Sequence, residues 1–208
     1  MAIKLFAFDT PNGRKVSVAL EEMALEYSVQ IVDITKDQQF EPEFLAISPN
    51  NKIPAIIDSE GPEGGPVSVF ESGAILIYLA EKTGQFLPKS SNQRIAVLEW
   101  LMFQMGGFGP APGQVHHFIG LESTEDKRYG LNRFMTETRR LYKVMDQRLA
   151  KHTYFADEIS IADFAILGWV WRHPRHQVDL ADYPSVKRWY ELMMDRAAVK
   201  RGFEVKLR

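Results

Sequence analysis

The residues best suited to hold a small ligand begin in the segment Ser48–Asp58, where turn formers are followed at once by a β-branched, apolar strand pattern. Lys52 supplies a cation at this turn. Proline has no backbone N–H, so Pro54 is expected where regular strand pairing starts. If the Ile53–Pro54 peptide bond is cis, the chain bends and turns the backbone N–H and C=O of Ile53 outward, ready to pair with an extended ligand. The residues alone leave both isomers open.

A helix start follows this strand region. Glu71 and Ser72 precede a strongly apolar run, and Ser72 is a favourable N-cap residue. The first N–H groups of a helix have no partner inside it and therefore attract anions. A lysine, an open strand end and a helix N-terminus together predict a site for a ligand with carboxylates and peptide groups. The structural alternatives are that Ser72 only caps a helix and that Lys52 is a solvated charge.

Composition limits the classes of function. The chain has 208 residues, of which 45% are hydrophobic, which is enough for one large domain or two small ones. Its net charge is −2 and it has no run of lysines or arginines, which argues against nucleic acid as a partner. No apolar run approaches the roughly 20 residues that span a bilayer, and no signal-peptide pattern opens the chain. We therefore expect a cytoplasmic protein with no membrane partner.

Cysteine is absent from the sequence. The chain therefore has no disulfide, no thiolate metal site and no thiol nucleophile of its own. His116 and His117 are adjacent, so they cannot easily point at one ion, and no carboxylate accompanies them at ligand spacing. We predict no metal site and interpret both histidines as packing or polar residues.

The hydrophobic pattern divides the chain in two. The first part predicts the element order β-α-β-α-β-β-α, and the remainder is helical throughout. Breakers and polar residues between them indicate a linker. The predicted strands cover residues 3–8, 27–32, 55–58 and 67–70, and the last helix of the first part covers 72–83. The fold class is α/β plus all-α, with a first domain over 1–84, a linker over 85–93 and a helical-bundle domain over 94–208.

Three features mark the helical part. The glycine–proline cluster over residues 106–113 predicts a kinked or interrupted helix. Ser160 to Asp163 form a capping-box pattern ahead of an apolar helix. Pro184 is expected near the first position of the last helix.

Six short motifs accompany this order of elements. Three of them are Asn51–Ala55, Phe70–Ile75 and Ser160–Asp163. With these, the chain resembles the cytosolic glutathione transferase superfamily, whose first domain is thioredoxin-like. The other three are Thr10–Gly13, Gln39–Leu45 and Gly113–Phe118. They resemble the Nu-class or yeast-prion-like subgroup, which implies glutathione-dependent disulfide reduction.

The resemblance implies a glutathione site in the first domain. Ser72 and the helix start would accept the γ-glutamyl carboxylate, and Glu71 would pair with the amine. The Ile53 backbone would pair with the cysteinyl unit beside a cis Pro54.

The glycine end of glutathione and a second glutathione would use other residues. Lys52 and Gln39 are placed to meet the glycine carboxylate. Because the chain has no cysteine, one glutathione thiolate would attack a disulfide and a second would resolve the mixed species. The site then needs room for two glutathiones or for oxidised glutathione, and Arg133 matches a subgroup position associated with the second molecule. From the residues alone, Arg133 is a charge on a helix surface.

The sulfur is expected near Thr10, between the first strand and the first helix. A helix N-terminus and hydrogen-bond donors stabilise a thiolate, and here the Thr10 hydroxyl and the Asn12 amide are the candidates. Without the resemblance, Thr-Pro-Asn-Gly is an ordinary turn sequence.

The resemblance therefore implies a glutathione-dependent disulfide-bond reductase with weak transferase or peroxidase activity. The small disulfide or electrophilic substrate would use a pocket to which the helical domain contributes, and the chain would form a homodimer. The alternatives are a conjugating transferase that acts on electrophiles and a glutathione-binding regulatory protein with little turnover.

Overall fold

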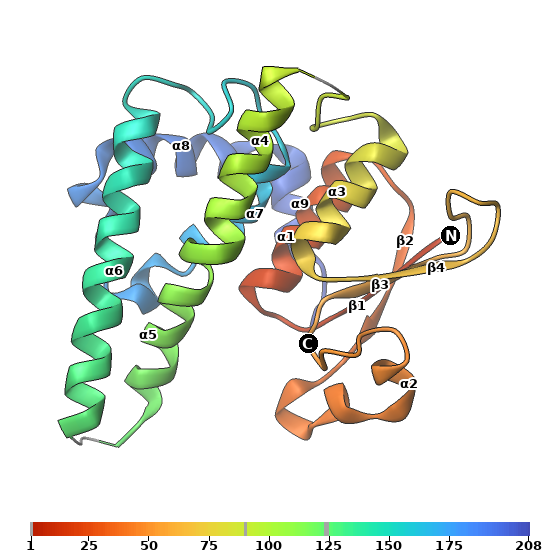
Figure 1. The fold of residues 1–208 in the computed structure, drawn as a ribbon, viewed down its shortest axis with the longest axis horizontal. Helices are drawn as coiled ribbons and strands as arrows, with labels where there is room; N and C mark the ends of the chain where they lie inside the picture. The colour runs from red at the N-terminus through yellow and green to blue at the C-terminus, as the bar shows by residue number, and fades with distance from the viewer. Residues whose placement is uncertain (1, 90, 123–124) are drawn as a thin grey trace. The chain divides into compact units, whose positions relative to one another are not determined.

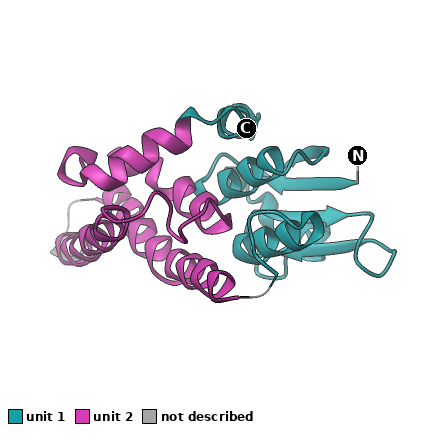
Figure 2. Ribbon diagram, turned by 90° about the horizontal axis from the view of Figure 1, so that it is seen from above, with its two compact units in different colours: residues 1–90, 195–208 teal, residues 91–194 magenta. Residues whose placement is uncertain are grey.

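The computed structural model describes residues 2–89, 91–122 and 125–208. Two compact units are distinguished in Figure 2. Unit 1 comprises residues 1–90 and 195–208, and unit 2 comprises residues 91–194. Position 90 of the predicted linker lies outside the described residues.

Unit 1 contains a four-stranded mixed sheet in the order β2-β1-β3-β4. Strand β1 runs parallel to β2, and β3 is antiparallel to both β1 and β4. The strands are β1 (Ile3–Ala7), β2 (Tyr27–Ile31), β3 (Ala55–Asp58) and β4 (Val67–Phe70). This is the predicted thioredoxin-like arrangement, and each strand begins at its predicted residue (Figure 1).

Helices cover the two faces of the sheet unequally. Helices α1 (Pro11–Glu22) and α3 (Ser72–Thr83) pack against each other. Along β1, Leu5 is fully buried, whereas Phe6 points to the other face and packs against Phe44, with ring centroids 6.4 Å apart. Phe44 belongs to the short α2 (Pro42–Leu45), which follows the 3₁₀ helices η1 (Ile34–Lys36) and η2 (Gln38–Phe40).

The last helix, α9 (Ala197–Glu204), belongs to unit 1, where it packs along α1. The hydrophobic pattern predicts that these residues belong to the helical domain over 94–208 and that the helix beginning at Pro184 is the last one. Periodicity shows that a helix has one apolar face but not which core will cover that face. Unit 1 is therefore assembled from two separate stretches of chain.

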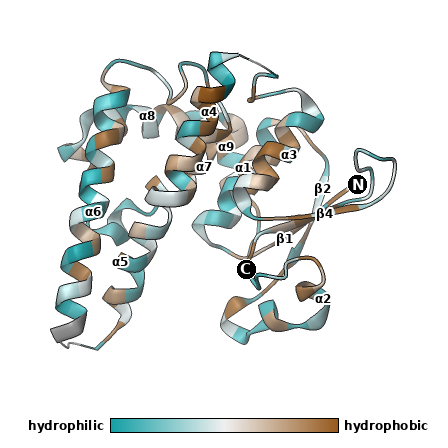
Figure 3. Ribbon diagram, viewed as in Figure 1, coloured by the Kyte–Doolittle hydropathy of each residue, from teal (hydrophilic) through white to brown (hydrophobic). Residues whose placement is uncertain are grey.

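Unit 2 is all-helical. Its centre is α7 (Ile161–Val170), in which every residue is buried. The other helices pack around a core to which α7 contributes, and Figure 3 shows the long α6 with extensive hydrophilic surface. They are α4 (Asn92–Phe103), the π-turn η3 (Gln104–Phe108), α5 (Pro110–Gly120), α6 (Glu125–Leu149), η4 (His173–His176), η5 (Leu180–Asp182) and α8 (Pro184–Asp195). Among the described helices, none has the length and apolar character that crossing a membrane requires.

The glycine–proline cluster interrupts the helix, as predicted, and a π-turn joins α4 to α5. The Gly109 N–H donates to the Gln104 carbonyl over 2.8 Å, which closes a π-turn, and α5 begins at the next residue. Pro110 is tolerated there because the first position of a helix needs no N–H. A Cβ at Gly109 would lie 2.8 Å from the Gln104 side chain, so a glycine permits this tight turn.

Candidate functional site

The turn before β3 has the geometry that the sequence suggested. The Ser48 hydroxyl donates to the Lys52 carbonyl over 2.8 Å, and the Ile53–Pro54 peptide bond is cis, as the resemblance implied. The Ile53 side chain packs against Phe44 and its buried neighbours. Its backbone N–H and C=O have no hydrogen-bond partner among the described residues, so both groups can pair with a ligand.

The start of α3 differs in detail from the prediction. The N-cap residue is Glu71, which has a φ of 68° and makes no capping hydrogen bond, and Ser72 is already the first helical residue. The prediction of Ser72 as the N-cap was therefore wrong. The chain reverses at Glu71 directly after β4, so the helix starts one residue earlier than the serine signal indicates. The Glu71 carboxylate is exposed and accepts from the Asn50 amide over 3.3 Å.

A buried cation, missed in the sequence analysis, lies beside Ser72. Lys15 of α1 is 1% exposed, and its Nζ donates to the Ser72 hydroxyl over 3.2 Å. Burial lowers the pKa of Lys15 to about 7, although the charge of Glu71 acts in the opposite direction. Lys15 follows Arg14 in a polar run, and no pattern in the sequence distinguishes it from a surface lysine. The contact joins the first turns of α1 and α3.

Thr10 caps α1. Its hydroxyl oxygen accepts from the Gly13 N–H over 3.2 Å, and its own N–H donates to the Phe8 carbonyl over 2.7 Å. Because the hydroxyl oxygen is the acceptor in the cap, its proton remains able to point toward a ligand. Asn12 is in the same first turn and is partly buried. A Cβ at position 13 would lie 2.5 Å from the Phe8 carbonyl oxygen, so this turn requires glycine.

Two predicted ligands of the glycine carboxylate lie on separate loops of unit 1. Lys52 is exposed in the turn before the cis peptide. Gln39 lies on η2, where its amide nitrogen donates to Asp37 over 3.4 Å. The Gln39 Oε1 is buried and accepts no hydrogen bond among the described residues. The structure gives no contact between these two side chains.

Arg133 belongs to unit 2. It is exposed on α6 and, with Tyr129 and Asn132, lines an open pocket of about 500 Å³. The pKa of the neighbouring Glu137 is lowered mainly by the hydrogen bonds that Arg140 donates to it, and to a smaller extent by the charges of Arg140 and Arg133. The structure therefore places Arg133 on a different unit from the other predicted site residues.

His116 and His117 differ in their surroundings. His116 stacks on Trp169 and on His176, with centroids 5.8 Å and 4.9 Å away, whereas His117 is exposed. Burial, reinforced by nearby arginines, lowers the pKa of His116 to about 4. Within the described residues, no three histidine, aspartate or glutamate side chains gather as metal ligands would.

Unit 1 thus presents, around the starts of α1 and α3, the groups that a negatively charged peptide needs. They are two helix N-termini, an unpaired backbone donor and acceptor at Ile53, a buried lysine and a hydroxyl able to donate. With no cysteine in the chain, any thiol chemistry here must use a sulfur that a ligand supplies.

Comparison with known proteins agrees with this picture. The N-terminal domain of glutathione S-transferase matches residues 1–81, and the C-terminal domain of glutathione S-transferase matches residues 113–197. The disulfide-bond oxidoreductase YfcG of Escherichia coli is 49% identical to this chain, over 94% of this chain and 92% of YfcG.

Two solved structures are similar throughout. A glutathione transferase from Pseudomonas putida, with one glutathione disulfide bound per subunit, has a TM-score of 0.93 at 44% identity and covers 98% of this chain and 91% of its own. A family member from Pseudomonas fluorescens, with two glutathiones bound, has a TM-score of 0.92 at 44% identity, with coverages of 97% and 92%. The chain therefore belongs to the glutathione S-transferase family.

Proposed function

We propose that this protein is a glutathione-dependent disulfide-bond reductase of the Nu-class type. The observation that carries the proposal is the likeness, over 94% of the chain, to a disulfide-bond oxidoreductase. The absence of cysteine supports it further, because the sulfur must then come from glutathione. Glutathione is thus a co-substrate.

Glutathione would lie along the rim of unit 1, within a proposed glutathione-binding domain over residues 1–84. Its γ-glutamyl carboxylate would accept hydrogen bonds from Ser72 and the first N–H groups of α3, with the charge of Lys15 close by. Glu71 would pair with the amine. The free N–H and C=O of Ile53 would pair with the cysteinyl unit. Lys52 would meet the glycine carboxylate, as would Gln39.

Thr10 would act on the sulfur. Its hydroxyl proton would donate to the thiolate, while the Gly13 N–H holds the hydroxyl oxygen in place. Asn12 would donate from the same turn. These interactions favour the thiolate over the thiol and so lower the thiol pKa.

Reduction would then proceed in two exchanges. The glutathione thiolate attacks one sulfur of the substrate disulfide, the substrate S–S bond breaks, and a substrate thiolate leaves and takes a proton from water. A second glutathione thiolate attacks the glutathione sulfur of the mixed disulfide and releases the other half of the substrate. The products are oxidised glutathione and two thiols. Arg133 would hold the second glutathione, and the P. fluorescens relative binds two glutathiones.

Conjugation of glutathione to electrophiles is the second candidate, because both solved relatives are named as glutathione transferases. Turnover of a small dialkyl disulfide and of an aryl halide, measured side by side with glutathione, separates the two activities. A reductase consumes the disulfide and is slow with the halide.

The role of Thr10 is tested by Thr10→Ala, with Thr10→Ser as the matched control that keeps the hydroxyl. We expect Thr10→Ala to lower kcat for disulfide reduction by about 10- to 100-fold, the range for loss of one hydrogen bond to a charged group, with little change in glutathione binding. Thr10→Ser should retain most of the activity. Equal turnover of wild type and Thr10→Ala would remove Thr10 from the mechanism.

A homodimer and a cytoplasmic location complete the proposal. Dimers are implied by the family resemblance, and sedimentation velocity that gives a monomer would contradict them. The cytoplasm holds the reduced glutathione pool that such an enzyme needs.

A further inference from the structure

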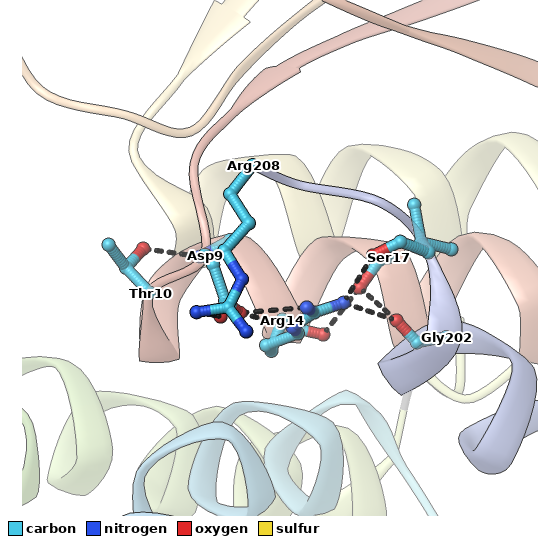
Figure 4. A network of polar contacts seen from close by, with 8 residues as sticks. Asp9, Thr10, Arg14, Ser17, Gly202 and Arg208 are labelled. Carbon is cyan, nitrogen blue, oxygen red and sulfur yellow. Dashed lines mark hydrogen bonds and ion pairs between the residues drawn. The ribbon is translucent and has the colours of Figure 1, made fainter. Parts of the chain in front are cut away.

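One buried arginine, Arg14, connects the turn that contains Thr10 to the last residues of the sequence. Arg14 is 6% exposed, and its Nε and Nη2 both donate to Asp9 Oδ1, over 2.9 Å and 2.7 Å. Asp9 directly precedes Thr10, and Arg14 follows it by one helical turn. This ion pair therefore closes a loop around Thr10 (Figure 4).

The same guanidinium reaches residues 202–208, which we call the C-terminal strap. Arg14 Nη1 donates to the Gly202 carbonyl over 3.2 Å and to the Val205 carbonyl over 2.9 Å. These carbonyls lie at the end of α9, where the negative end of the helix favours a cation. The Ser17 hydroxyl also donates to the Gly202 carbonyl over 2.8 Å.

Packing supports these bonds. Leu207 of the strap is fully buried, and its Cδ1 lies 3.5 Å from the place where a Cβ on Gly13 would be. Gly13 is the residue whose N–H holds the Thr10 hydroxyl. Arg208 Nη1 lies 3.9 Å from Asp9 Oδ2. The strap thus contacts both sides of the Thr10 turn.

The opposite end of α1 is attached to α9 in a different way. Arg201 pairs with Glu21 over 2.7 Å, and Arg196 pairs with Glu22 over 2.6 Å, and both arginine side chains are substantially exposed. These pairs hold the same two helices together but lie about three turns of α1 from Thr10. They provide an internal control for any effect on Thr10.

We propose that the C-terminal strap is a positioning element for the thiolate site and acts on Thr10 through Arg14. It rests on the proposed function. By fixing Asp9 on one side and Gly13 on the other, the strap sets the direction of the Thr10 hydroxyl. Loss of the strap then weakens the hydrogen bond to the sulfur more than it weakens the binding of glutathione.

The test compares Arg14→Lys, and separately deletion of residues 206–208, with Arg201→Ala in the full chain. Arg14→Lys keeps a charge but cannot span Asp9 and two carbonyls together. Three quantities are measured: amide hydrogen exchange at Gly13 without ligand, the ultraviolet absorbance of bound glutathione thiolate against pH, and kcat and KM for disulfide reduction. Thermal unfolding reports the general loss of stability.

Both strap variants should raise Gly13 exchange by about tenfold, which corresponds to about 1.4 kcal/mol of local stability. They should also raise the pKa of the bound thiol and lower kcat while KM for glutathione changes little. Arg201→Ala should lower the melting temperature without moving the thiol pKa. Equal thiol pKa values in Arg14→Lys and Arg201→Ala would overturn the proposal, as would unchanged Gly13 exchange in the strap variants. Failure of wild type to bind glutathione would instead refute the proposed function, and the exchange measurement would still report on the strap.

Discussion

A serine that the sequence marks as a helix start lies at the beginning of both α3 and α7, yet different groups form hydrogen bonds with the two serines. At α7, the Asp163 carboxylate is fully buried and accepts from the Ser160 N–H and hydroxyl, the Phe155 N–H and the Trp189 indole. At α3, no acidic side chain lies in the first turn, and the side chain of Ser72 accepts from a buried lysine instead.

The difference lies in the third helical position. Asp163 occupies that position in α7 and brings a negative charge to the N-terminus. Ala74 occupies it in α3, so the positive end of that helix keeps its attraction for an anion. We therefore expect the α7 start to serve the fold and the α3 start, which has no acid in its first turn, to serve a ligand. This comparison makes three predictions, which decrease in expected size.

The largest effect is expected from Asp163→Ala, which removes the acceptor of four buried hydrogen bonds. Buried donors left without partners, among them the Trp189 indole, should lower the free energy of unfolding by about 3–5 kcal/mol. Denaturant titration measures the loss. Asp157→Ala is the control, because that carboxylate is 56% exposed although it contacts Arg148 and His152. A loss at Asp163 no greater than that at Asp157 would show that the α7 start is not structural.

The second prediction is that removing the hydroxyl of Ser72 and removing that of Ser160 have opposite consequences for binding and for stability. Ser72→Ala should weaken glutathione binding about tenfold to a hundredfold, the range of a hydrogen bond to a charged group, and change stability by less than about 1 kcal/mol. Ser160→Ala should lower stability by about 1 kcal/mol and leave binding unchanged. Titration calorimetry and denaturant unfolding separate the two. The comparison fails if both serines affect the same quantity.

The third prediction concerns the pH dependence of stability. Burial lowers the pKa of Lys15 to about 7 in the folded protein, whereas an unfolded lysine titrates near 10.4. Between these pH values the unfolded chain holds the proton that the folded chain has lost. Stability therefore rises with pH, by up to about 1.4 kcal/mol per pH unit from this group.

Lys15→Met should remove the contribution of Lys15 to this rise in stability with pH. The free energy of unfolding is measured for wild type and variant from pH 7 to 10, and the difference between them isolates the contribution of Lys15 from those of other titrating groups. Lys52→Met is the control, because Lys52 is an exposed cation of the same unit. Parallel stability curves for wild type and Lys15→Met would mean that Lys15 keeps its proton when buried.

Much of unit 1 could be predicted from the sequence. The bounds of β3, β4 and α3 match the prediction because proline, glycine and polar clusters delimit them sharply. Gly84 ends α3 in the left-handed conformation, as its position after Thr83 indicates. The capping box at Ser160 was also predicted correctly, because its two partners are only three residues apart.

Contacts between distant residues could not be predicted in this way. The burial of Lys15 depends on α3, which lies 57 residues further along the chain. The return of α9 to α1 depends on a core that periodicity does not identify. The positive φ of Glu71, which makes Glu71 rather than Ser72 the N-cap of α3, could not be predicted from a glutamate in the sequence.

The discontinuity of unit 1 has a consequence for its biosynthesis. A ribosome delivers the four strands with α1 and α3 first, then about a hundred residues of unit 2, and only afterwards the helix that covers α1. Until then the α1 surface under Gly202, where Val18 will be buried, stays without its cover. The sheet domain therefore cannot complete its packing until the whole helical unit has been translated.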